Sequence, residues 1–161
     1  MKIKFSILLP LVISVLNLFA QQTVKIDNGG HFVMTGNVRV VVNGGVNLSS
    51  STSALTIQSG TLSLNAGSEL ANSGTITNNS MITNAGTNSG AGTYKGSGTY
   101  SGSEFVNATG GTVAPGNNSV ACLTFSNGFS NLGTLEIDVD DSVTPCTDFD
   151  RINVTGTASL G

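Results

Sequence analysis

The two cysteines are the side chains best suited to a defined chemical role. Cys122 and Cys146 are the only cysteines, and they stand 24 residues apart. In a stack of short strands this spacing is close to one turn, and equivalent positions in adjacent turns lie about 4.8 Å apart. A disulfide needs a Cα separation of about 4.4–6.8 Å. We therefore predict a Cys122–Cys146 disulfide; the alternatives are two free thiols or a metal pair, for which cysteines without neighbouring histidines are poorly suited.

Acidic side chains gather in one stretch of the last third. Six of the nine acidic residues fall there: Glu136, Asp138, Asp140, Asp141, Asp148 and Asp150. Carboxylate oxygens are ligands that Ca²⁺ accepts, and alternate residues of a strand share one face. No Asp-x-Asp-x-Asp-Gly calcium loop is present, however. We expect no metal and no cofactor, with these six residues as weak calcium candidates; the alternative is a solvated face that discourages pairing of strand edges.

A catalytic site would need groups arranged around a nucleophile or a bound cation. His31 is the single histidine, and no Gly-x-Ser-x-Gly motif is present, so we interpret His31 as an ordinary strand residue. Asp148, Asp150 and Arg151 carry the side chains of a cation-dependent site that cleaves acidic polysaccharides. We favour a structural role for them and expect no enzyme activity.

Two tyrosines suggest a different kind of site. Tyr94 and Tyr100 lie six residues apart and would form a small aromatic platform for a sugar if both rings faced outward. The alternative, which we favour, is that they stack in the core or in a surface ladder.

Short strands must position all of these residues. Val, Ile and Leu alternate with small polar residues in brief runs separated by Gly or Asn turns. Apolar residues recur at every sixth position between 64 and 106, with one exception, Asn88: Leu64, Leu70, Ile76, Ile82, Tyr94, Tyr100 and Val106. Three such steps make about one turn of a three-sided coil, and stacked coils bury one another's apolar faces. We predict an all-β parallel β-solenoid of on the order of six to eight turns. The six-residue step by itself favours a left-handed coil, and a β-sandwich is the competing architecture.

The N-terminal residues have the layout of a secretory signal peptide. Lys2 and Lys4 precede an apolar run over 7–16, and a polar segment follows Ala20, after which we predict cleavage. The run is shorter than the roughly 20 residues that cross a bilayer, so no membrane span is expected in the mature chain. The formal net charge of −3 becomes about −5 once both lysines are removed. Such a chain has no basic patch, and no nucleic-acid partner is expected.

The last third resembles a known family. Residues 111–119 read Gly-Thr-Val-Ala-Pro-Gly-Asn-Asn-Ser, a Gly-Thr-Leu-Glu-Ile-Asp-Val segment follows at 133–139, and 148–161 end in Thr-Gly-Thr-Ala-Ser-Leu-Gly. In this order the segments are similar to the passenger-associated repeats of bacterial autotransporters, which are β-helical surface adhesins. The resemblance implies a right-handed parallel β-helix displayed outside the cell, often adhesive, with no shared catalytic residue.

These observations give one expected organisation and function. We predict a signal peptide (1–20), degenerate β-solenoid repeats (21–109) and a passenger-like repeat (110–161) that is truncated at its C-terminal end. The expected protein is an exported structural or adhesive β-solenoid module, extracellular or on the outer cell surface. Its expected partners are a host or cell-surface glycan or protein, and the remaining repeats of a longer polypeptide. The alternatives are a carbohydrate-processing β-helix enzyme and a truncated fragment without function.

Overall fold

The computed structural model describes residues 16–17, 23–140 and 143–161. Ala20 and nearly all of the predicted signal peptide lie outside these residues. One short strand of that segment, β1 (Leu16–Asn17), pairs in parallel with β4 (Arg39–Val42). The described residues contain no helix that is long and apolar enough to cross a membrane.

Every regular element of the described chain is a strand of two to four residues. The remaining strands are β2 (Val24–Ile26), β3 (His31–Met34), β5 (Val46–Leu48), β6 (Ala54–Ile57), β7 (Thr61–Leu64), β8 (Glu69–Asn72), β9 (Thr75–Asn78), β10 (Met81–Asn84), β11 (Thr87–Ser89), β12 (Thr93–Gly96), β13 (Thr99–Gly102), β14 (Phe105–Asn107), β15 (Thr112–Pro115), β16 (Cys122–Phe125), β17 (Phe129–Asn131), β18 (Thr134–Leu135), β19 (Arg151–Val154) and β20 (Ala158–Leu160).

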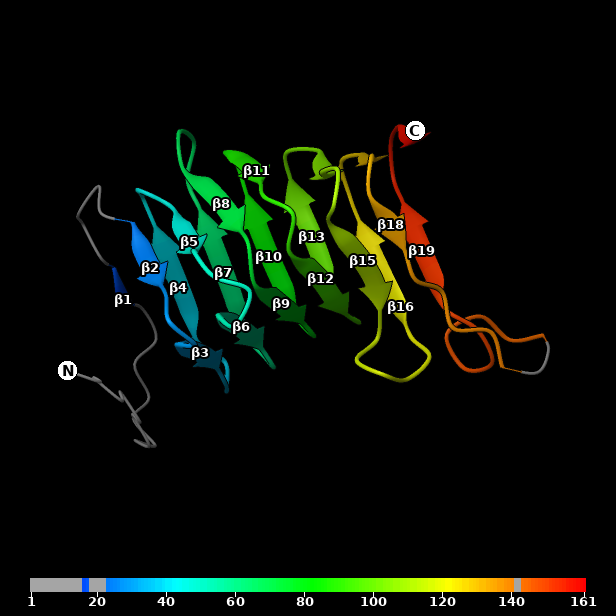
Figure 1. Ribbon diagram of the computed structural model, residues 1–161. Coiled ribbons are helices and arrows are strands. Elements are labelled where there is room, and N and C mark those ends of the chain that lie inside the picture. The colour runs from blue at the N-terminus through cyan, green and yellow to red at the C-terminus, as the bar shows by residue number, and fades with distance from the viewer. Residues whose placement is uncertain (1–15, 18–22, 141–142) are drawn as a thin grey trace.

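The strands form four parallel sheets on three sides of a coil (Figure 1). Sheet 1 has the order β1-β4-β7-β10-β13-β16-β19, and sheet 2 has the order β18-β15-β12-β9-β6-β3. The third side consists of sheet 3, β11-β8-β5-β2, and sheet 4, β14-β17-β20. Consecutive strands belong to different sheets, and each strand pairs with the strand one turn away, as β9 does with β12. The predicted all-β parallel solenoid is confirmed, and the β-sandwich alternative is wrong. The right hand of the coil stays a prediction.

The solenoid has about five turns, fewer than the six to eight predicted. The predicted number assumed 18 residues per turn, which holds in the middle, where Thr75 pairs with Thr93. Later coils are longer because loops are inserted at their corners. Cys122 of β16 pairs with Arg151 of β19, 29 residues further on.

The six-residue step marks the core up to Tyr100. Its apolar members are almost fully buried: Leu64, Leu70, Ile76, Ile82, Tyr94 and Tyr100. Burial of side chains of this size stabilises the fold by about 1.5–3 kcal/mol each. The step fails at Val106, because Phe105 and Asn107 point inward from β14 while Val106 is half-buried.

Buried asparagines form the corners of the coil that contains β8, β9 and β10. Asn72, Asn78 and Asn84 end these strands, and the side-chain oxygen of each accepts a hydrogen bond from the backbone N–H two residues later. The side-chain amide of Asn78 donates to the carbonyl of Thr99 in the next coil, at 3.0 Å. These bonds satisfy polar groups that would otherwise be costly to bury.

Glycines cover these corners in the next coil. Gly90, Gly96 and Gly102 have positive φ and lie directly over the three asparagines. A Cβ atom at Gly102 would lie 2.1 Å from the carbonyl oxygen of Asn84, so no larger residue fits there without separating the coils. The repeated Gly and Asn residues of the sequence are therefore explained by the close contact between the backbones of adjacent coils at these corners.

Asn88, the exception in the six-residue step, joins sheet 3 to sheet 4. Its side-chain amide donates to the carbonyl of Val106 at 2.7 Å, and its side-chain oxygen accepts from the N–H of Val106 at 3.1 Å. The side chain therefore replaces the missing backbone pairing between β11 and β14. A polar residue at this core-facing position has a structural reason.

Candidate functional site

Two loops widen the solenoid at the corner between sheets 2 and 1, in its last coils. The first loop, 116–121, connects β15 to β16, and the second, 136–150, connects β18 to β19. Figure 1 shows both extending beyond the strands, in yellow and orange. We call them the corner loops. They are the main departure of the described chain from a regular coil.

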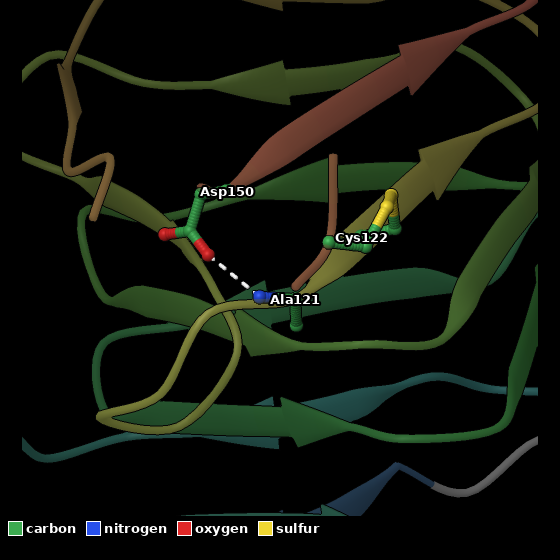
Figure 2. Close-up of a disulfide and its surroundings, with 4 residues drawn as sticks. Ala121, Cys122 and Asp150 are labelled. Carbon is green, nitrogen blue, oxygen red and sulfur yellow. Dashed lines mark hydrogen bonds between the residues drawn. A yellow bond between two sulfur atoms is a disulfide. The ribbon is translucent and has the colours of Figure 1, made fainter. Parts of the chain in front are cut away.

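A buried carboxylate links the corner loops (Figure 2). Asp150 is only 5% exposed. Its Oδ1 accepts from the N–H of Ala121 at 2.7 Å, and its Oδ2 accepts from the N–H of Asp138 at 2.9 Å. Hydrogen bonds from two backbone donors compensate for removing the charge from water. Asp150 therefore fixes the start and the end of the second loop to the end of the first.

A second carboxylate organises the far end of the second loop. Asp148 Oδ2 accepts from the N–H of Thr144 at 3.0 Å and from that of Val143 at 3.3 Å. These two bonds, the bond from Thr144 first, lower the pKa of Asp148. Backbone bonds between Asp140 and Asp148, and between Asp150 and Asp138, close the base of the loop.

The two cysteines fasten the same loop to sheet 1. Cys122 in β16 and Cys146 in the second corner loop form a disulfide, with their Cα atoms 4.9 Å apart. The pairing agrees with the prediction, but its basis does not: the residue stacked on Cys122 in the next coil is Arg151, not Cys146. The bond ties the loop to a neighbouring strand instead of joining equivalent positions of two turns.

Between these loops and sheet 2 lies a polar groove of about 360 Å³. Its floor consists of outward-facing residues of β12 and β15, among them Thr93, Lys95 and Ala114. Its walls carry Pro115 at the end of β15, Gly116 and Asn118 from the first loop, and Glu136, Asp138 and Asp150 from the second. The size falls within the range of about 300–1,000 Å³ that small-molecule sites occupy.

Five side chains of the groove have no protein partner among the described residues. No hydrogen bond or ion pair involves the side chains of these residues, which are Thr93, Lys95, Asn118, Glu136 and Asp138. Glu136, Asp138 and Asn118 are exposed, while Thr93 and Lys95 are half-exposed. One ammonium, two carboxylates, an amide and a hydroxyl are thus free to contact a ligand.

The six acidic calcium candidates serve different purposes. Asp148 and Asp150 bind backbone N–H groups, whereas Glu136 and Asp138 line the groove. Asp140 is exposed, and Asp141 lies outside the described residues. Within the described ranges, no group of three or more His, Cys, Asp or Glu side chains could hold a metal ion.

The two sets of residues considered for catalysis lie at opposite ends of the solenoid. His31 lies in β3, at the first coil, whereas Asp148, Asp150 and Arg151 lie at the last coils. Arg151 begins β19 and is exposed beside Cys122, and the two acids hold the loop. The two acids thus have structural contacts, and the structural role of Arg151 stays a prediction.

Tyr94 and Tyr100 form part of the core, as favoured, and not a sugar platform. Both rings are at most 2% exposed and pack against Phe105 and Phe125. Their hydroxyl oxygens accept from the side-chain amides of Asn78 and Asn84, each at 2.8 Å. Burial raises the pKa of Tyr94, and it raises that of Tyr100 to about 12.

The sequence reasoning missed Thr93, Lys95 and Asn118 as groove residues. Lys95 is an isolated cation within a stretch of small polar residues, and Asn118 follows a Pro-Gly turn. Neither signal shows that β12 lies beside the second corner loop, because about 40 residues separate them in the chain. Only the stacking of coils brings them together.

The fold and the groove define the class: a parallel β-solenoid with one corner enlarged by a disulfide-anchored loop. Comparison with known proteins does not narrow this class, since no family model, no curated protein and no solved structure matches the chain.

Proposed function

We propose that the chain is an exported β-solenoid module that acts as a rigid, adhesive surface element without catalysis. The observation that carries the proposal is a column of hydroxyl groups along the outer face of sheet 2. Thr75, Thr93, Thr112 and Thr134 pair in register through four successive coils. The column passes into the groove at Thr93.

Such a column suits repeated weak contacts. Adjacent strands lie about 4.8 Å apart, and the paired backbones fix the position of each hydroxyl. A ligand with regularly spaced polar groups meets several contacts at once, and linked weak contacts raise the overall affinity without a deep pocket. The second column of the same face adds the half-exposed Thr56 and Lys95, whereas Thr77 between them is buried.

The disulfide and the N-terminal sequence support export. Disulfides persist in oxidising compartments and are rare in the cytosol. The Cys122–Cys146 bond ties down a loop that has few apolar residues to hold it, and Val139 and Val143 of this loop are largely exposed. The predicted signal peptide would deliver the chain to such a compartment.

Export and adhesion can be tested separately. When the full chain is expressed in a Gram-negative host, it should accumulate in the periplasm, and its intact mass should be that of a chain beginning at Gln21. A cytoplasmic product that retains Met1 would contradict export. For adhesion, beads coated with residues 23–161 are washed in a flow chamber over films of cellulose, pectin and gelatin. We expect retention on at least one film at least tenfold above albumin-coated beads.

A matched pair of variants locates the adhesive face. Thr75→Lys/Thr112→Lys changes the hydroxyl column, and Thr61→Lys/Thr99→Lys makes the same change on the outer face of sheet 1. We expect retention to fall at least tenfold in the first variant only. Retention on none of the films, or release of reducing ends from a film in proportion to added protein, would refute an adhesive, non-catalytic role.

A further inference from the structure

We propose that the groove between the corner loops and sheet 2 binds a neutral saccharide of one or two rings within a longer glycan. This proposal rests on the proposed adhesive function and assigns it a ligand class and a site. The groove encloses about 360 Å³, which leaves room for such a ligand, whereas a second cavity, lined by Leu70, Ile76 and Tyr94 among others, encloses only about 10 Å³.

The free side chains of the groove match the hydrogen bonding of a sugar. Each sugar hydroxyl both donates and accepts a hydrogen bond, so a binding site needs donors and acceptors side by side. Glu136 and Asp138 accept, Lys95 donates, and Thr93 and Asn118 do both. All five side chains lack protein partners in the described chain, so a ligand would not have to break existing bonds.

The mixture of charges favours a neutral ligand over an ionic one. An anionic ligand would meet three carboxylates, of which that of Asp150 already accepts bonds from two backbone N–H groups, against one ammonium, and a cationic ligand would place its charge near Lys95. Charge repulsion of this kind lowers the affinity for ionic ligands, and so it contributes to specificity more than to the affinity for the correct ligand. A polyhydroxyl ligand carries no charge to be repelled and uses both kinds of group.

The apolar part of the groove fits the C–H face of a sugar ring. Ala114 and Pro115 belong to β15 and lie between the polar side chains of β12 and those of the second corner loop. No aromatic ring lines the groove, so affinity would come from polar contacts and from multivalency along the column of threonines.

The groove is fixed in shape before a ligand arrives. Its floor belongs to paired strands, and Asp150 and the Cys122–Cys146 bond hold the second corner loop in place. A site on rigid elements loses less entropy when a ligand binds. Asp150 acts here as a positioning residue, because both of its carboxylate oxygens are engaged with backbone donors.

The test is a titration of ¹⁵N-labelled residues 23–161, followed by amide chemical shifts. The probes are cellohexaose, mannohexaose and N-acetylchitohexaose as neutral sugars, tetragalacturonate as an anion and hexalysine as a cation. We expect at least one neutral probe to shift the amides of Thr93, Gly116 and Asp138 saturably, with a Kd of about 1 mM. Absence of saturable shifts with all three neutral probes, or stronger binding of an ionic probe in the groove, would overturn the proposal.

Matched variants separate the groove from the rest of the surface. Glu136→Gln/Asp138→Asn and Lys95→Gln should each weaken binding at least tenfold, whereas the control Glu104→Gln, on the side of sheet 4, should leave it unchanged. The amide spectra outside the groove report whether each variant is folded. Equal affinity in the groove variants and in the control would refute the assignment of the site.

The two proposals can fail independently. If beads carrying Glu136→Gln/Asp138→Asn adhere to films as well as the parent does, the groove assignment is wrong and the adhesive function stands. If a neutral hexasaccharide saturates the groove while beads adhere to no film, the adhesive function is wrong and the saccharide site stands.

Discussion

Replacing Gly102 by Ala tests whether the glycine corners are required by contact between coils. Gly102 has φ +103°, and a Cβ atom there would lie 2.1 Å from the carbonyl oxygen of Asn84 and 2.6 Å from its carbonyl carbon. A suitable control is Gly67→Ala, because Gly67 also has positive φ, +81°, but its Cβ would meet no atom within 4 Å. The difference between the two variants isolates the contact from the backbone strain.

The expected magnitudes follow from these two terms. A non-glycine residue held at positive φ costs about 1–2 kcal/mol, which applies to both variants. In Gly102→Ala the obstructing atoms are backbone atoms of a paired strand and cannot rotate away. The two coils must then separate at this corner, which weakens the bond from Asn84 to the hydroxyl of Tyr100. We expect Gly67→Ala to lose about 1–2 kcal/mol and Gly102→Ala to lose more than about 4 kcal/mol, in the range of severe core mutations.

Urea denaturation followed by far-UV circular dichroism measures both losses as changes in the free energy of unfolding. In thermal unfolding, each kcal/mol corresponds to roughly 3–5 °C for a chain of this size. Residues 23–161 should be compared at one protein concentration with the disulfide oxidised. Equal losses in Gly102→Ala and Gly67→Ala would show that the corners tolerate a methyl group. The account of the close coil contact would then be wrong.

Three further predictions concern the second corner loop and the core. Asp148 has a lowered pKa in the folded state, so it binds fewer protons there than in the unfolded state. Its contribution to stability is complete above the ordinary pKa of 3.8 and is lost as the pH falls through the lowered pKa. Asp148→Asn should remove this part of the pH dependence of the free energy of unfolding, measured by urea denaturation. Ionisation of Tyr100, followed by ultraviolet absorbance, should occur only near pH 12, and a transition near pH 10 in the folded protein would show that its ring is accessible. Cys122→Ser/Cys146→Ser should lower the free energy of unfolding by roughly 3 kcal/mol. In hydrogen exchange this variant should lose protection in 136–150 while β9, β10 and β12 keep theirs; uniform loss of protection would contradict a local role of the bond.

The sequence predicts the core of this protein better than its surface. The six-residue step is visible in the sequence because each coil must present apolar side chains inward at equivalent places, so apolar residues recur at a constant spacing. It fails at Val106 because Phe105 and Asn107, not Val106, face inward in β14, and Asn88 bonds Val106 through two hydrogen bonds that no pattern of hydrophobicity records. Local regularity is readable, and a change of register is not.

The corner loops were less predictable for the same reason. For the acidic stretch after Leu135 the sequence favours a solvated face over calcium ligands, but composition alone does not show where each carboxylate points. The structure gives Asp150 two backbone donors and leaves the side chains of Glu136 and Asp138 in the groove without partners among the described residues. The difference depends on contacts between residues 12 to 29 positions apart, which are made only after the coils stack.

The position of the groove follows from how a solenoid accommodates extra residues. Inserting a single residue into a strand would turn every later side chain of that strand to the opposite face, so additional chain is accepted more easily at corners. Here two successive coils carry insertions at the same corner, 116–121 and 136–150, and Asp150 joins them. The two adjacent insertions face the outer surface of sheet 2 and enclose a space beside it. Replacing 136–149 by a Gly-Gly link, with Cys122→Ser to avoid a free thiol, removes Glu136 and Asp138 from the groove and should therefore abolish saccharide binding, while β9, β10 and β12 stay protected from hydrogen exchange. Saccharide binding that survives this deletion would show that the second corner loop is not part of the site.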